Sequence, residues 1–480
     1  MKQKNIRVLF VHFVKSNNLL NKPLFNQKEI PFGVSYIMSV LRQNNFQYDV
    51  IITDKNYNKK EIDKKIKEFR PKLICIYCLS SYFNHILGFC EYLKTIYSKI
   101  LILLGGPHIT LNPKLDMDSP YDIINIGEGE YPVLELLRQL EQNKEPTRIK
   151  NLWIKKKRHI EKNTIRDYIQ DIDKIPFPER EIWQKYILNK NSEHVIFLGR
   201  GCPFNCNYCS NHKLKSISKS KYVRLRNPKY IIKEIMELLE KFKGINRICF
   251  EIETIGENKK FINLLSKELQ GLNQRLTRKL EFGANLRITE NLDQEYLFNR
   301  LKKANFKYLK IGIESGSEKI RRAVISRNYS NKKITEVAKS ARKYNLSIQV
   351  YVMIGLPYET KNDFKETIHL LKKIKPDIIF QNIFYPYTGT EIYDICKNNN
   401  LLKKNYLNKR ERYNVVINSK GFSEINIMMY FIFLQYIIQR NYKPLSYVAK
   451  QTIYRILNSL IHRKVYNSFI VSRYLFKSQR

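Results

Sequence analysis

Short apolar segments alternate with helix-like segments along most of this 480-residue chain. Residues 1–143 contain four apolar segments of strand length, and residues 191–400 contain six more. Buried strands that alternate with helices form parallel sheets, which bind ligands at the carboxyl ends of their strands. We therefore predict an α/β protein, with a doubly wound, Rossmann-like domain over 1–143 and a partial (β/α)6 barrel over 191–400. The predicted strands are IRVLFVHF, YDVIITD, KLICIYC and KILILLGG, followed by HVIFLGR, NRICFEIE, LEFGANLRI, YLKIGIES, SIQVYVMIGLP and PDIIFQNIFYP.

Two further regions lack this alternation. Residues 144–190 are polar and charged and contain the segment DKIPFPER, which predicts a linker between the two domains. Residues 401–480 predict a helical C-terminal region. Its most apolar segment, INIMMYFIFLQYIIQR, is interrupted by Asn426 and Gln435 and is shorter than the roughly 20 apolar residues of a membrane-spanning helix. We expect a buried helix here, with an amphipathic surface helix as the alternative.

Three of the eight cysteines lie within the segment GRGCPFNCNYCS, at Cys202, Cys206 and Cys209. The chain opens on a predicted buried strand rather than an export signal, so we expect a reducing, cytoplasmic location in which clustered thiols bind metals. Thiolates are soft ligands that suit zinc or iron–sulfur clusters. A structural zinc ion needs a fourth ligand, for which His212 is close in sequence. A [4Fe–4S] cluster held by three thiolates instead leaves one iron open to a small molecule.

The C-x3-C-x2-C spacing, with Tyr208 before the last cysteine, resembles that of the radical SAM enzymes. Four later segments resemble the family's motifs in the expected order: FEIETIGENKKF, GIESGSEKIRRAV, MIGLPYETKNDFKETI and FYPYTGTEIYD. The resemblance implies that the three cysteines hold a [4Fe–4S] cluster whose open iron binds S-adenosylmethionine (SAM). It also implies that reduction of the cluster cleaves SAM and releases a 5′-deoxyadenosyl radical.

The same resemblance implies which residues contact SAM. A carboxylate at the end of the second barrel strand, Glu253 or Glu251, would accept hydrogen bonds from the SAM amino group. The family's acidic pair favours Glu253, although Ile252 interrupts that pair in this chain. For each predicted contact the alternative is a buried salt bridge or a turn residue. The other predicted contacts are Arg287 for the carboxylate, Glu314 and Ser315 for the ribose or methionine part, and Gly355 and Tyr208 for the adenine.

The first domain resembles the cobalamin-binding domain that precedes many radical SAM enzymes. The matching stretches are PFGVSYIMSVLRQNNFQYDVIITD, LLGGPHITLNP and DIINIGEGEYPVLELL. The D-x-H-x-x-G signature of domains that ligate cobalt with histidine does not occur, so we expect no protein histidine on the lower face of the cobalamin. Glycines let a flat macrocycle approach the backbone, or they simply make tight turns. The predicted cobalamin contacts are Gly105, Gly106, His108, Gly127, Glu128 and Gly129.

Together these resemblances imply a cobalamin-dependent methyltransferase that acts on an unactivated carbon or phosphorus centre through methylcobalamin. Radical cyclisation, oxidation or rearrangement by the same two domains is the alternative. A methylthiotransferase would need a second cluster, for which Cys75, Cys78 and Cys90 are the available thiols. Cys75 and Cys78 point to opposite faces of one predicted strand, which argues against shared ligation.

The net charge of +42 is explained either by an anionic partner or by a compositional bias toward Lys, Asn, Ile and Tyr, and we favour the bias. The basic residues are spread along the whole chain, so we do not expect a nucleic-acid partner. A nucleic-acid- or membrane-binding protein with a structural cluster remains the alternative from a different class. We expect a small-molecule or lipid substrate and an electron donor such as flavodoxin or ferredoxin, and we leave peripheral membrane contact open.

Overall fold

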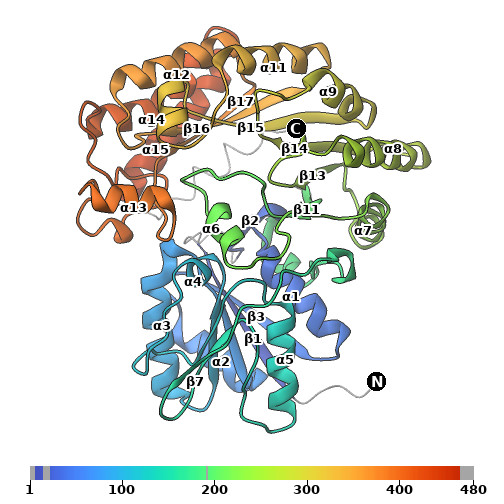
Figure 1. Cartoon of the computed structure of the whole chain (residues 1–480), viewed down its shortest axis with the longest axis vertical. Helices are drawn as coiled ribbons and strands as arrows, with labels where there is room; N and C mark the ends of the chain where they lie inside the picture. Colours follow the sequence, from blue (N-terminus) through green and yellow to red (C-terminus); the bar gives the residue numbers. More distant parts are fainter. Residues whose placement is uncertain (1–5, 15–21, 191–192, 465–480) are drawn as a thin grey trace.

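The first domain is built on a mixed sheet in the computed structural model, which describes residues 6–14, 22–190 and 193–464 (Figure 1). Five of its strands are parallel, in the spatial order β3-β1-β4-β5-β6. In such a doubly wound sheet the strand order reverses between β1 and β4, and ligands bind beside that point. The strands are β1 (Arg7–Phe13), β3 (Gln47–Thr53), β4 (Leu73–Tyr77), β5 (Leu101–Gly105) and β6 (Ile123–Asn125); the helices are α1 (Phe32–Gln43), α2 (Lys59–Phe69), α3 (Phe83–Ile96), α4 (Pro107–Leu111) and α5 (Glu130–Glu141).

The predicted linker is partly sheet. Strands β7 (Leu152–Lys155) and β8 (Ile160–Lys162) extend the first sheet from β6 in antiparallel pairing. The prediction of a linker over 144–190 was therefore wrong for this hairpin. Strands of three or four residues with lysines around them carry too little apolar pattern to be found in a sequence. Two other short strands, β2 (Leu24–Asn26) and β9 (Ile187–Asn189), pair with each other outside the main sheets.

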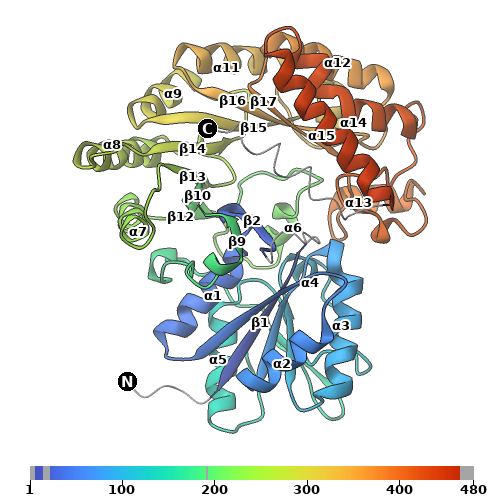
Figure 2. The same cartoon turned by 180° about the vertical axis from the view of Figure 1, so that it is seen from behind.

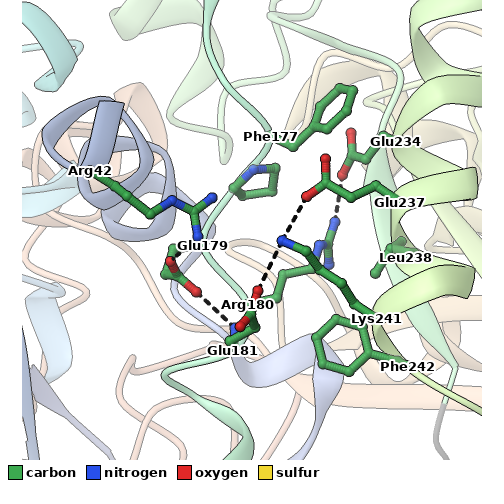
Figure 3. A pocket seen from close by; sticks show the side chains of 11 residues that line it. Arg42, Phe177, Glu179, Arg180, Glu181, Glu234, Glu237, Leu238, Lys241 and Phe242 are labelled. Carbon is green, nitrogen blue, oxygen red and sulfur yellow. Dashed lines mark hydrogen bonds and ion pairs between the residues drawn. The ribbon is translucent and has the colours of Figure 1, made fainter. Parts of the chain in front are cut away.

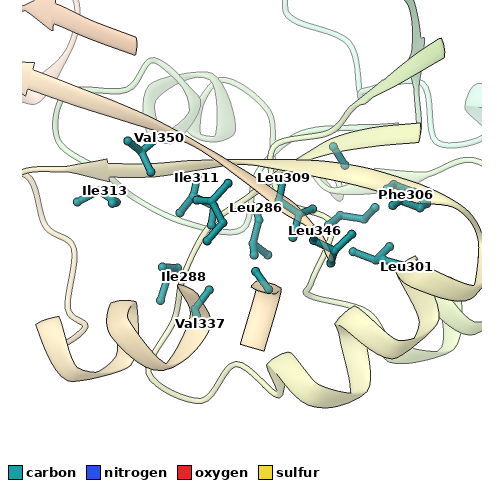
Figure 4. Packing of buried hydrophobic residues seen from close by; sticks show 14 of the residues in the cluster. Leu286, Ile288, Leu301, Phe306, Leu309, Ile311, Ile313, Val337, Leu346 and Val350 are labelled. Carbon is teal, nitrogen blue, oxygen red and sulfur yellow. The ribbon is translucent and has the colours of Figure 1, made fainter. Parts of the chain in front are cut away.

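The second domain contains the six predicted parallel strands, in sequential order, as an open barrel. The helices cover its outer face, where Ile311 and Val350 of the sheet belong to the same buried apolar cluster as α11 residue Val337 (Figure 4). Helix α7 begins at Pro228 with the Asn227 side chain as N-cap, as predicted. The strands are β10 (His194–Phe197), β13 (Arg247–Glu251), β14 (Glu281–Leu286), β15 (Phe306–Glu314), β16 (Ser347–Ile354) and β17 (Ile378–Ile383); the helices are α7 (Pro228–Lys241), α8 (Lys259–Arg275), α9 (Gln294–Lys303), α10 (Glu318–Ala323), α11 (Asn331–Lys343), α12 (Lys361–Ile374) and α13 (Glu391–Asn398).

The C-terminal region adds helices α14 (Glu424–Gln439) and α15 (Leu445–Lys464). Helix α14 packs one face against β16, β17 and α12, while Ile425, Met429 and Phe433 are exposed, so the predicted buried helix is only half-buried. Gln435, one of the polar interruptions, donates to the carbonyl of Ile379 in the last barrel strand at 2.8 Å. The helix thereby covers an edge strand that would otherwise expose unpaired backbone groups. Among the described helices, none combines the length and apolar character that crossing a bilayer requires.

The carboxyl ends of the two sheets face each other (Figures 1 and 2). Helix α4, which follows β5, contacts α6 (Asn211–Ser216), which follows the cysteine segment. Asn112 donates to the carbonyl of Thr388, beyond the last barrel strand, at 3.2 Å. The segment between the domains is anchored on both sides. Figure 3 shows Arg42 of α1 beside Glu179 (2.7 Å) and Arg180 beside Glu234 of α7 (2.6 Å).

Candidate active site

The cysteine segment forms a loop that leaves a small hairpin of β11 (Gly199–Arg200) and β12 (Arg224–Leu225) and ends at α6. Gly201 has a φ of +86°, and a Cβ there would lie 2.3 Å from the carbonyl oxygen of Tyr222. Glycine is therefore required at the turn that leads into the cysteines. Cys202 and Cys206 are buried and Cys209 is half-buried.

The donors around the cysteine sulfurs fit an iron–sulfur cluster. Arg287 Nη1 lies 2.6 Å from Cys206 Sγ, and Asn211 Nδ2 lies 3.5 Å from Cys209 Sγ. Hydrogen bonds of this kind stabilise and tune cluster thiolates. Burial raises the pKa of the Cys202 thiol to about 11, so iron would displace a proton when it binds.

The zinc alternative gains no support from the described part of the chain. No three His, Cys, Asp or Glu side chains there are placed to hold a single metal ion. A four-iron cluster instead spreads its thiolates over separate irons, so this finding does not bear on it.

The two candidate carboxylates of the acidic motif lie in different surroundings. Burial raises the pKa of Glu253, which is hydrogen-bonded to Asn211. Together with burial, the charge of Glu253 raises the pKa of the Cys202 and Cys209 thiols. Glu251 instead accepts from Asn285 Nδ2 at 2.6 Å and pairs with Lys310 at 3.5 Å. Glu253 is therefore the carboxylate beside the cysteine loop, in agreement with the preferred choice from the sequence.

Tyr208 and Glu314, both predicted at SAM, meet in a buried cluster with Arg327. The Tyr208 hydroxyl donates to Glu314 Oε1 at 3.0 Å, and Arg327 Nη2 lies 3.2 Å from the same oxygen and also bonds the Tyr208 hydroxyl. Glu314 has a φ of +65°, a conformation that is uncommon and costly outside glycine. The sequence analysis missed Arg327, because nothing distinguishes it among 86 basic residues.

Ser315 and Gly355 are joined through a second missed residue, Glu359. Its carboxylate accepts from the Gly355 and Leu356 amides at 2.8 and 3.2 Å and lies 3.5 Å from Ser315 Oγ. Burial raises the pKa of Glu359 to about 8. Ser315 is fully buried, and a Cβ on Gly355 would lie 2.9 Å from Ile427 of α14. In this structure these residues shape the backbone of the site rather than present side chains.

Arg287 lies against the cysteine loop, as expected for a residue near SAM. Its guanidinium is 3.7 Å from the centre of the Phe204 ring. Its Nε is buried and has no hydrogen-bond partner among the described residues. A buried donor without a partner suits an anionic ligand group.

The two glycines at the end of β5, Gly105 and Gly106, serve different purposes. Gly106 has a φ of +101°, and a Cβ there would lie 2.9 Å from the Tyr77 ring, so the fold itself requires glycine. A Cβ on Gly105 would make only ordinary contacts, the nearest at 3.7 Å. His108 packs its ring on Phe83, with 4.1 Å between the ring centres, and its Nδ1 is hydrogen-bonded to Ser80 Oγ at 3.0 Å. Burial lowers the pKa of His108 to about 4, so the ring is neutral.

In the loop after β6, the Glu128 side chain points elsewhere than predicted. Glu128 accepts from Arg200 and Arg224 of the barrel hairpin at 2.9 and 2.8 Å. Burial alone would raise the pKa of Glu128, but the charges of these two arginines hold that pKa below its usual range. The carboxylate predicted to contact cobalamin is thus directed at the barrel. Gly127 has a φ of +86°, and a Cβ on Gly129 would lie 2.8 Å from Ile37, so both glycines are explained by turn and packing.

Sequence comparison identifies two domain families in this chain. A model described as the radical SAM superfamily matches residues 196–371, and one described as the B12 binding domain matches residues 25–137. A methyltransferase from Pyrococcus horikoshii, itself named as uncharacterized, is 30% identical over 382 residues, which are 78% of this chain and 79% of that protein. An anaerobic magnesium-protoporphyrin IX monomethyl ester cyclase from Cereibacter sphaeroides is 24% identical over 375 residues, 76% of this chain and 60% of the cyclase.

Solved structures share the fold at low sequence identity. The radical SAM methyltransferase TsrM from Kitasatospora setae, with tryptophan substrate and a SAM analogue bound, matches 82% of this chain and 76% of its own. Its TM-score is 0.63 at 12% identity. The cobalamin-dependent radical SAM enzyme OxsB matches 95% of this chain and 71% of its own, with a TM-score of 0.68 at 14% identity.

Proposed function

Because this chain belongs to the radical SAM enzymes that carry a cobalamin-binding domain, we propose that it methylates an unactivated carbon or phosphorus centre of a small molecule. The observation that carries the proposal is the contact between α4 and α6. Helix α4 lies at the carboxyl ends of the first-domain strands, which we call the cobalamin edge, and α6 lies beside the cysteines, at the barrel edge. This contact brings the ligand edges of the two domains together, as a reaction that uses both cofactors requires.

Different side chains would hold the iron–sulfur cluster and the separate groups of SAM. Cys202, Cys206 and Cys209 would hold the cluster, while Glu253 and Arg287 would bind the amino and carboxylate groups of SAM. When bound, the cluster supplies the electron that cleaves SAM, and cobalamin carries the methyl group. The buried cluster of Tyr208, Glu314 and Arg327 would orient the nucleoside and keep water away.

A radical cyclisation is the second candidate, because one relative is named as a cyclase. We expect an electron donor such as flavodoxin or ferredoxin for either reaction. A substrate of lipid character and peripheral membrane contact remain part of this proposal, supported by the high positive charge.

The test is anaerobic reconstitution of the full chain with iron and sulfide, then cobalamin and SAM. We expect 5′-deoxyadenosine after reduction, cobalamin retained through gel filtration, and a product heavier by one methylene group. Absence of 5′-deoxyadenosine would overturn the radical assignment. A product without the added methylene would favour cyclisation, oxidation or rearrangement.

A further inference from the structure

An ion-pair cluster connects the two ligand edges. Arg200, two residues before Cys202, donates from Nη1 to Glu128 at 2.9 Å and from Nη2 to Glu130 at 2.6 Å. Arg224, on the other strand of the hairpin, donates to Glu128 at 2.8 Å. The arginines belong to the barrel and the glutamates to the cobalamin-binding domain, so the cluster crosses the domain boundary.

The ion-pair cluster is mostly buried, with Arg200 the most exposed member at 21%, and it is balanced in charge. Only 4% of the side-chain surface is exposed for Arg224 and for Glu130, and 14% for Glu128. The Arg200 guanidinium lies 5.0 Å from the centre of the Tyr36 ring, which further fixes its orientation. Charges buried in this way are costly to leave unpaired, so the two domains hold each other in one arrangement at this point.

Hydrogen bonds continue from the hairpin to the cysteine loop. Gly201, between Arg200 and Cys202, packs its backbone against the carbonyl of Tyr222. The Tyr222 hydroxyl donates to Asn211 Oδ1 at 2.5 Å, and Asn211 Nδ2 lies 3.5 Å from Cys209 Sγ. A displacement of the two arginines would therefore also move the cysteine loop at both of its ends, near Gly201 and near Asn211.

We propose that Glu128 and Glu130 are positioning residues that hold the cysteine loop at a fixed distance from the cobalamin edge. This inference rests on the two-cofactor chemistry of the proposed function. Reacting groups must be held within about 0.5 Å of their productive geometry, and a misplacement of about 1 Å can cost roughly 100-fold in rate. Glu128 and Glu130 would thus bind arginines of the barrel rather than the cobalamin itself.

The test compares Glu128→Gln and Arg200→Lys with a matched control in the full chain loaded with cluster and cobalamin. Lysine keeps the charge of Arg200 but lacks the planar guanidinium, whose Nη1 and Nη2 each donate to a different glutamate. Glu135→Gln is the control, because it removes a two-bond ion pair with Arg166 (3.0 and 2.9 Å) without touching the hairpin. Iron and cobalamin content are measured first. Pulsed EPR then gives the distance between the reduced cluster and Co(II), and hydrogen exchange of the apoprotein follows residues 199–211.

We expect both test variants to retain iron and cobalamin within about twofold of wild type, while the cluster–cobalt distance shifts or broadens by about 1 Å. Exchange over residues 199–211 should rise in both variants and not in the control. Distances identical to those of wild type and control would overturn the positioning role. Failure of the wild type to retain cobalamin would instead overturn the proposed function and this inference with it.

Discussion

The carboxyl-end edges of the two sheets, the barrel edge and the cobalamin edge, present different kinds of groups to each other. At the barrel edge, charged side chains gather around the cysteines, with Arg287 on Cys206 and the buried Glu314–Arg327 pair beneath Tyr208. At the cobalamin edge, the end of β5 and the residues after it include two glycines and a neutral histidine. Glu128, in the loop after β6, and Glu130, at the start of α5, are directed at the barrel.

This difference follows the chemistry of the two expected ligands. SAM is small and carries separate positive and negative groups, which paired charges in a buried site recognise well. A corrin macrocycle is large and flat, and it needs room along the backbone more than it needs charge. Each edge can therefore be disrupted by a different kind of substitution.

The largest effect is expected from the cysteines. Cys206→Ala should lose the cluster and reduce 5′-deoxyadenosine formation to background, because two thiolates leave a second iron without a protein ligand. Iron analysis and product chromatography measure both. Cys90→Ala, in a buried apolar cluster of the first domain, should cost about 1 kcal/mol of stability and keep the iron. Normal iron content in Cys206→Ala would contradict the assignment.

The next largest effect tests the charge pairing at the barrel edge. Glu314→Gln leaves the Arg327 guanidinium buried without its counter-charge, so we expect SAM affinity to fall at least about tenfold. Equilibrium dialysis of the cluster-loaded protein measures this. Glu281→Gln breaks the exposed pair with Arg247 at the opposite end of the same sheet, and its effect should be small. Equal SAM affinities in the two variants would show that Glu314 does not contribute to SAM binding.

Gly105 and Gly106, at the end of β5, separate what the fold requires from what the ligand requires. Gly106→Ala should lower the free energy of unfolding by about 1–3 kcal/mol, because its positive φ and the Tyr77 ring exclude a Cβ. Gly105→Ala should leave stability almost unchanged, since its Cβ fits the apoprotein. Loss of cobalamin in Gly105→Ala, measured by absorbance after gel filtration, would show that this space is for the ligand. Full cobalamin retention would mean that the macrocycle lies elsewhere.

The smallest effect concerns the neutral histidine. Because burial lowers the pKa of His108 to about 4, only the unfolded chain takes up this proton between about pH 6.5 and pH 4. Its contribution to stability is therefore present above pH 6.5 and is lost as the pH falls toward 4, by at most about 1.4 kcal/mol per pH unit. Urea unfolding of the apoprotein at pH 7 and pH 5 measures the loss, and His108→Gln should reduce it. An unchanged pH dependence in that variant would place the titration elsewhere.

The sequence by itself determined the parallel strands of the two sheets, the cysteine loop and the existence of helix α14. Each of these is encoded locally, in the spacing of apolar residues, in a helix cap such as Asn227, or in three cysteines within eight residues. Local patterns also placed Glu253, Arg287 and Tyr208 at strand ends or in the loop, where the structure brings them together.

Only the tertiary structure decided which charges meet. Arg327 and Tyr208 are 119 residues apart, and Glu128 and Arg200 are 72 residues apart, so no local pattern pairs them. Sequence reasoning placed Glu128 at the cobalamin because its loop follows a strand, whereas the packing of the second domain turned the carboxylate toward Arg200 and Arg224. The physical reason is that a buried charge lies where its partner lies, and the partner is fixed by how the two domains pack.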